Sequence, residues 1–78
     1  MAQPDRVLQG LGKALHDARE KQGLTQEALS LETGVHRNYI GGIERGERSP
    51  SVAAIAKLAD VLDVSLADLF RQAEQIVG

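Results

Sequence analysis

Apolar residues recur at intervals of three and four along most of this 78-residue chain, which is the spacing of an amphipathic helix. Glycine, serine and proline residues stand between these stretches, where they are typical of helix ends. No stretch alternates apolar and polar residues as a half-buried strand would, and no segment is repeated. The pattern therefore predicts an all-α fold of five helices joined by short connections.

The first predicted helix carries its apolar stripe over residues 7–18 and ends near Gln22, where Gly23 is a C-cap signal. Two glycines interrupt it, because Gly10 and Gly12 would each cost about 1 kcal/mol in a helix interior. The pattern therefore leaves the start of this helix open.

Two further helices are predicted in the second half of the chain. Ser49 and Pro50 predict the start of the fourth, with serine as N-cap and proline at the first helical position, and Asp63 marks its end. Ser65 opens a variant of the capping box, which predicts a fifth helix over residues 65–77.

The segment from Gln26 to Arg45 holds two short predicted helices separated by a tight turn at Gly34. Thr25 is the expected N-cap of the first, and a glycine suits the positive φ that often follows a helix end. The second, at about residues 36–45, begins with a dense run of polar side chains. A polar helix face held by a partner helix across a short turn is the design of a helix-turn-helix reader of DNA.

The charge distribution qualifies this interpretation. The formal net charge is −2, which argues mildly against a nucleic-acid partner. Residues 36–50 nevertheless contain three arginines and two glutamates, whereas residues 51–78 contain two basic and four acidic side chains. The acidic excess therefore lies away from the predicted reading helix. Few phosphates could be neutralised, which predicts weak non-specific binding with a modest salt dependence.

Composition excludes several other classes of protein. The chain has no cysteine, and His16 and His36 lie far apart without a carboxylate cluster, so we expect no disulfide, metal site or cofactor. No uninterrupted apolar stretch fits a leader or a membrane span, and we expect a cytoplasmic, nucleoid-associated protein. Ser30, His16 and Asp17 share no catalytic motif, so we do not expect an enzyme. We expect one domain over residues 1–78, with no room for a separate ligand-sensing domain and no small-molecule ligand.

Several spaced motifs together resemble the phage Cro and repressor type of helix-turn-helix family, also called the xenobiotic-response-element (XRE) family. The motifs are Leu24–Leu29 (LTQEAL), Gly34-Val35, Tyr39-Ile40, Ile43–Gly46 (IERG), Pro50-Ser51, Leu58-Ala59 with Leu62, and Val64-Ser65 with Leu69-Phe70. The resemblance covers about residues 11–70. It implies a five-helix, lambda-repressor-like DNA-binding domain that acts as a sequence-specific transcriptional regulator, as a dimeric repressor or autoregulator.

The resemblance also implies roles for individual residues. Gln26 matches a phosphate-contacting glutamine at the N-terminus of the second helix, where free amide donors favour an anion. His36, Arg37 and Asn38 occupy the base-reading positions, at which arginine can pair with guanine and asparagine with adenine. For His36 the alternatives are a phosphate contact or a polar residue that merely starts the helix.

Arg45 and Arg48 match the region that contacts the DNA backbone after the reading helix. Tyr39 is left between two interpretations, a phosphate contact through its hydroxyl and packing on the core. Arg19 and Glu44 match a buried or half-buried ion pair between the first and third helices. The resemblance implies a structural role for this pair rather than a contact with DNA.

Two glycines depart from the family pattern, which has side-chain-bearing polar residues at these positions. Gly42 matches a position that often reaches the major groove, so one contact is expected to be absent. Together Gly41 and Gly42 should weaken the helix by about 2 kcal/mol, and we expect it to order fully only on DNA. These glycines and the acidic net charge keep an alternative open, a protein-interaction module of the same fold with weak or no DNA binding.

The apolar stripe of the fifth helix extends further than a single domain needs. Its last part, Phe70, Ala73, Ile76 and Val77, predicts a homodimer interface, and the alternative is a frayed end. Two-fold pairing would double the base contacts and suit a palindromic operator of double-stranded DNA.

Overall fold

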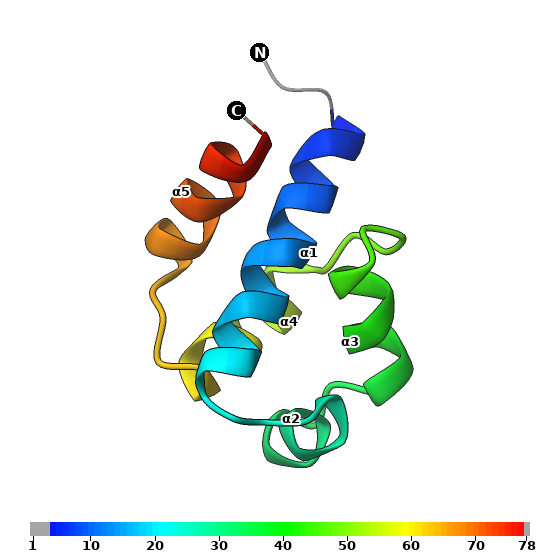
Figure 1. Cartoon of the computed structure of the whole chain (residues 1–78). Helices are drawn as coiled ribbons and strands as arrows, with labels where there is room; N and C mark the ends of the chain where they lie inside the picture. Colours follow the sequence, from blue (N-terminus) through cyan, green and yellow to red (C-terminus); the bar gives the residue numbers. More distant parts are fainter. Residues whose placement is uncertain (1–3, 78) are drawn as a thin grey trace.

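The computed structural model describes residues 4–77, and within them it contains helices and no strand. The helices are α1 (Pro4–Lys21), α2 (Gln26–Thr33), α3 (Arg37–Glu44), α4 (Val52–Val61) and α5 (Leu66–Val77). Figure 1 shows α1 in the middle of the molecule, with α5 along one side, α3 on the other and α2 across the end. The predicted five-helix, all-α fold is confirmed.

The hydrophobic core lies around α1, and every helix contributes to it. Its largest fully buried side chains are Leu15, Leu29, Ile40, Ile43, Leu58 and Leu69. Burying one such side chain contributes about 1.5–3 kcal/mol. Because α2 and α3 have 8 residues each, neither would be stable alone in water, and this packing is what holds them as helices.

Most helix ends follow the predicted signals. Thr25 Oγ1 accepts a hydrogen bond from the backbone N–H of Ala28 at 3.0 Å, and Gly34 ends α2 with φ 76°. Ser65 Oγ accepts the backbone N–H of Asp68 at 3.0 Å at the start of α5. These bonds satisfy amide groups that the first turn of a helix leaves without partners.

The predicted start of α4 is wrong by two residues. Ser51, and not Ser49, is the N-cap, since its Oγ accepts the backbone N–H of Ala54 at 3.0 Å. The carbonyl of Ser49 accepts a hydrogen bond from the hydroxyl of Tyr39 at 3.1 Å. This long-range bond, which local sequence signals do not reveal, keeps Ser49 and Pro50 in the loop that precedes the helix.

Gly12 lies where α1 passes close to the end of α3. A Cβ atom at this position would collide with the backbone carbonyl oxygens of Ile43 and Glu44. The sequence suggested only a cost in helix propensity here, but the missing side chain allows two helices to approach. The last residue of α3 is thereby held against α1.

Candidate nucleic-acid interface

The helix-turn-helix consists of α2 and α3 with Gly34 between them. The backbone N–H of Gly34 donates to the Ser30 carbonyl at 2.8 Å, and Val35, directly after it, is buried. Leu29 of α2 and Ile40 of α3 are both fully buried. The apolar side of each helix is therefore fixed inward, and the first turn of α3 faces solvent.

His36 is the N-cap of α3 rather than a residue within the helix. Its Nδ1 accepts the backbone N–H of Asn38 at 3.0 Å. A neutral imidazole that accepts at Nδ1 carries its proton on Nε2. The capping bond thus leaves Nε2–H as a donor on the exposed side of the helix.

Arg37 and Asn38, the first two residues of α3, are exposed. Neither side chain has a hydrogen bond or ion pair to another residue within 4–77. Arg37 also lines a shallow hollow of about 240 Å³ together with residues of α2 and His36. Both side chains are therefore available to a partner that approaches the start of α3.

Glu44, the last residue of α3, is the centre of a polar cluster that joins three helices. Arg19 donates to its carboxylate twice, from Nε to Oε2 at 2.7 Å and from Nη2 to Oε1 at 2.9 Å. Gln26 Nε2 donates to Oε1 at 3.2 Å, and His16 Nδ1 lies 3.0 Å from the same oxygen. Arg19 Nη1 also donates to the Leu24 carbonyl at 2.8 Å. The ion pair implied by the family resemblance is present.

The cluster keeps Glu44 ionised despite its burial. Burial would raise the pKa of the carboxyl, but hydrogen bonds from Arg19, His16 and Gln26 outweigh it, and the pKa lies below its ordinary value. The hydrogen bond to Glu44 raises the pKa of Arg19. His16 was not assigned to this cluster from the sequence. Its position three residues before Arg19, on the same face of α1, is the signal that could have indicated it.

The side chains of Gln26 and Arg45 both lie close to Gly41, which has no side chain of its own to separate them. A Cβ atom on Gly41 would lie 3.0 Å from Arg45 Nη1 and 3.3 Å from Gln26 Oε1. Arg45 itself is exposed, and its Nε donates to Glu47 Oε1 at 3.1 Å. Gln26 and Arg45 lie at the two ends of the helix-turn-helix, and the sequence predicts a phosphate contact for each. The structure places them next to each other.

Gly42 is buried beneath another side chain. A Cβ atom there would collide with the aliphatic part of Arg48, which occupies the space that the glycine leaves. The Arg48 guanidinium lies over the ring of Tyr39, 5.3 Å from its centroid. The sequence predicted a missing contact at Gly42, and the structure shows that this glycine gives Arg48 room to pack.

For Tyr39 the structure favours packing over a phosphate contact. Its ring is half-buried against the core, and its hydroxyl donates to the Ser49 carbonyl and accepts the Ser51 backbone N–H, each at 3.1 Å. A hydroxyl has one hydrogen to donate, and here the loop before α4 receives it. A phosphate contact through this group would require that bond to break.

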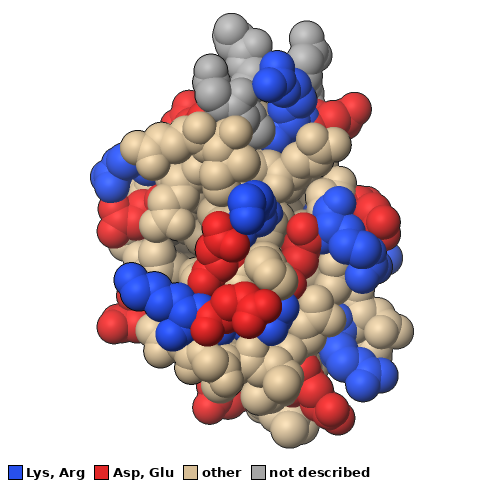
Figure 2. Space-filling view, in the orientation of Figure 1, with Lys and Arg blue, Asp and Glu red and all other residues tan. Residues whose placement is uncertain are grey.

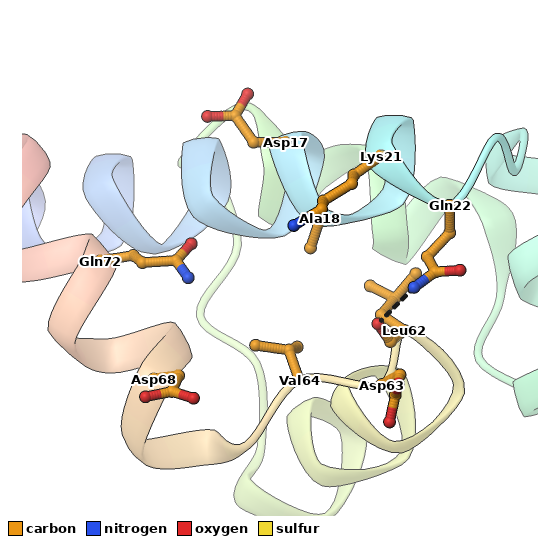
Figure 3. Close-up of a pocket in the computed structure, with 9 residues that line it drawn as sticks. All are labelled: Asp17, Ala18, Lys21, Gln22, Leu62, Asp63, Val64, Asp68 and Gln72. Carbon is orange, nitrogen blue, oxygen red and sulfur yellow. Dashed lines mark hydrogen bonds between the residues drawn. The ribbon is translucent and has the colours of Figure 1, made fainter.

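Charged side chains of both signs are spread over the surface. Figure 2 shows Lys and Arg side chains on the side of the molecule where α3 lies, with acidic side chains beside them, and mixed charges over α1. A hollow of about 500 Å³ lies between the end of α1, the turn after α4, and α5, on the other side of α1 from α3. Ala18, Val64 and the amide of Gln72 point into it (Figure 3). Asp17, Asp63 and Asp68 line it against one lysine, Lys21, so this hollow does not suit a phosphate backbone.

The predicted dimer residues of α5 separate into different environments. Ala73 is 0% exposed within the monomer, so its assignment to a dimer interface is wrong, because α5 uses this face to pack on α1. Phe70 and Ile76 are 40% and 42% exposed. They lie about 120° apart around the helix, on opposite borders of the buried stripe. The side chain of Val77 lies outside the described residues.

Two features of the described part of the chain concern other functions. Within residues 4–77 no group of three or more His, Cys, Asp or Glu side chains is arranged to hold a metal ion. No helix there is long and apolar enough to cross a bilayer.

Comparison with known proteins agrees with this geometry. Residues 15–69 match a protein family described as Helix-turn-helix. YazB of Bacillus subtilis, an uncharacterized HTH-type transcriptional regulator, is 40% identical over 58 residues, which are 74% of this chain and 84% of YazB. The control protein C.BamHI of Bacillus amyloliquefaciens is 43% identical over 49 residues, 63% of this chain and 60% of that protein.

Solved structures agree as well. The restriction-modification controller protein C.AhdI of Aeromonas hydrophila superposes with a TM-score of 0.76 at 42% identity, covering 80% of this chain and 94% of C.AhdI. The controller protein C.Esp1396I, solved as a tetramer with its natural 35 base-pair operator, gives a TM-score of 0.79 at 27% identity. That match covers 91% of this chain and 93% of the controller.

Proposed function

The chain belongs to the XRE-type helix-turn-helix family of transcriptional regulators, and we propose that it binds operator DNA through α3 as a homodimer. The observation that carries the proposal is the exposed first turn of α3. His36, Arg37 and Asn38 lie there together and are exposed. The side chains of Arg37 and Asn38 have no hydrogen bond or ion pair to another residue within 4–77. The N-terminal residues of such a helix contact base edges when it lies in the major groove.

Each of these residues has a chemical role in the proposal. Arg37 donates two hydrogen bonds to O6 and N7 of a guanine, and Asn38 pairs with N6 and N7 of an adenine. His36 offers its Nε2–H to a base or to a nearby phosphate. Direct readout of this kind distinguishes all four base pairs in the major groove.

Contacts with DNA phosphates are proposed on either side of these base contacts. Gln26 stands at the N-terminus of α2, where unpaired backbone amides favour an anion. Arg45 lies beside it over Gly41, so both side chains can reach one stretch of DNA backbone. Arg48 provides a second cationic contact, and Tyr39 supports it by stacking beneath its guanidinium.

Dimerisation is proposed through the exposed part of α5. Ile76 is an exposed large apolar side chain on one border of the buried stripe, and Phe70 is exposed on the opposite border. A single small domain reads few base pairs, and a two-fold dimer on a palindromic operator reads twice as many. The tetramer of the similar controller C.Esp1396I with its operator supports assembly on DNA in this family.

A protein-interaction module of the same fold is the alternative function. The net charge of −2 and the glycine pair in α3 favour it, since both reduce attraction to DNA. The two functions differ in one observable property. A regulator prefers one DNA sequence over others at a fixed salt concentration, whereas the interaction module does not.

The test begins by selecting duplexes from a random pool with the purified protein. Binding of the selected duplex and of a shuffled duplex is then measured by fluorescence anisotropy at several salt concentrations. The regulator binds the selected duplex about 10³-fold or more tightly than the shuffled one. An unenriched pool, or equal affinity for both duplexes, would favour the interaction module.

A further inference from the structure

We propose that Glu44 is a positioning residue for DNA binding, which orients the Gln26 carboxamide toward a DNA phosphate. Glu44 does not touch DNA in this proposal and acts only through Gln26. The inference rests on the proposed function, because it assumes that Gln26 contacts phosphate. It assigns to the carboxylate a role in affinity in addition to its role in stability.

The hydrogen bond between the two side chains fixes which way the carboxamide faces. Gln26 Nε2 donates to Glu44 Oε1 at 3.2 Å. In the flipped orientation the amide oxygen would face the carboxylate oxygen, and two acceptors would repel each other. One orientation is therefore favoured. An amide nitrogen has two hydrogens, so Nε2 keeps one for an acceptor outside the cluster.

The carboxylate can impose this orientation because it is itself immobile. The side chain of Glu44 is 5% exposed, and both of its oxygens accept hydrogen bonds from Arg19. Arg19 also donates to the carbonyl of Leu24, which precedes the N-cap of α2. One connected set of bonds thus runs from α1 through the last residue of α3 to the first residue of α2.

The charges of the cluster are compatible with a phosphate nearby. An isolated carboxylate beside the DNA backbone would repel it, but Arg19 neutralises Glu44 through two charge-assisted hydrogen bonds. Arg45 adds positive charge on the other side of Gly41. His16 shares the Glu44 oxygen that holds Gln26, and its Nε2 lies 3.3 Å from Glu20. The phosphate therefore meets an amide donor and a guanidinium rather than an unpaired carboxylate.

The test separates positioning from stability by removing both members of the ion pair. A variant with Arg19→Met and Glu44→Met leaves no buried charge unpaired, so the fold is retained, which circular dichroism and thermal unfolding verify. Affinity for the selected duplex is measured in this variant, in Gln26→Ala and in the triple variant. We expect about a tenfold loss in each of the three, with the salt slope unchanged, because a neutral amide releases no counterion from the phosphate.

Each alternative result has a defined meaning. Wild-type affinity in the folded double variant, or a further tenfold loss when Gln26→Ala is added to it, would overturn the positioning role. Unchanged affinity in Gln26→Ala alone would overturn the phosphate contact in the proposed function, and the inference with it.

A second measurement needs no variant. The two side-chain amide protons of Gln26 are followed by NMR, with the exposed Gln75 as the matched control. We expect one proton to exchange with water several-fold more slowly than those of Gln75, and the other to shift when the duplex is added. Exchange of both at the rate of Gln75 would contradict the proposal.

Discussion

Arg19 of α1 and Glu44 at the end of α3 form a bidentate ion pair, in which Arg19 Nε lies 2.7 Å from Glu44 Oε2 and Arg19 Nη2 lies 2.9 Å from Glu44 Oε1. The two side chains are 9% and 5% exposed. Within residues 4–77 no buried side-chain nitrogen or oxygen lacks a hydrogen-bond partner. The position of α3 therefore depends on a polar contact as well as on the apolar core.

Removing one partner of this pair should be costly. Arg19→Ala leaves the Glu44 carboxylate buried without its cation, and we expect a loss of about 3–5 kcal/mol in the free energy of unfolding. The sequence preference of the protein that remains folded should not change. Urea unfolding measures the loss, and a double-mutant cycle with Glu44→Gln measures the coupling between the two residues. A coupling of zero would show that the pair is not an energetic unit.

The free energy of unfolding should depend on pH through the ionisation of Glu44. Its pKa is lowered in the folded protein from an ordinary value of 4.5, so the folded state holds the ionised form more tightly than the unfolded state does. The resulting stabilisation is present above the ordinary value and is lost as the pH falls through the folded pKa. Urea unfolding at pH 6 and at pH 3 should therefore show that the free energy of unfolding falls more between these two pH values in the wild type than in Glu44→Gln. Equal losses in both proteins would contradict this assignment.

Gly12→Ala should destabilise the protein although alanine is the better helix former by about 1 kcal/mol. The added methyl group would collide with the carbonyl oxygens of Ile43 and Glu44, which are backbone atoms and cannot rotate away. We expect a net loss of roughly 1–3 kcal/mol. Lys13→Ala, at an exposed neighbouring position, is the control and should change the stability by less than about 0.5 kcal/mol. Stabilisation by Gly12→Ala would show that the helices can separate without cost.

Ile76→Asp should convert the proposed dimer to monomers. The side chain is 42% exposed, so the monomer tolerates a charge there, whereas an apolar interface would not. Equilibrium sedimentation of wild type and variant measures the difference, and circular dichroism checks that the variant is folded. Operator affinity should fall much more than non-specific affinity. A wild-type protein that sediments as a monomer at tens of micromolar and binds DNA one chain at a time would exclude the dimer.

Local sequence signals predicted much of the fold because they act over short distances. Thr25, Gly34 and Ser65 sit at the expected helix ends, since capping needs only a side chain and an amide three residues away. The start of α4 was missed because a tertiary bond from Tyr39 holds Ser49 in the loop. The benefit of Gly12 was missed for the same reason, as it lies in a backbone approach between distant segments.

The candidate site was predicted unevenly. The family resemblance identified the Arg19–Glu44 pair, but composition and spacing alone could not join residues 25 positions apart. The prediction for the fifth helix rests on its apolar stripe. An apolar stripe does not show whether the helix packs on α1 of the same chain or on a partner chain. Ala73 was placed on the wrong side for that reason.

Arg37→Ala tests most directly whether the first turn of α3 reads bases. Anisotropy titrations compare wild type and variant on the selected duplex, on duplexes with single guanine substitutions and on a shuffled duplex, all at one salt concentration. The variant should lose roughly 1–3 kcal/mol of binding free energy on the selected duplex and become indifferent to one base position per half-site, with little loss on shuffled DNA. An equal loss on every duplex would make Arg37 a phosphate contact and contradict base reading by this residue.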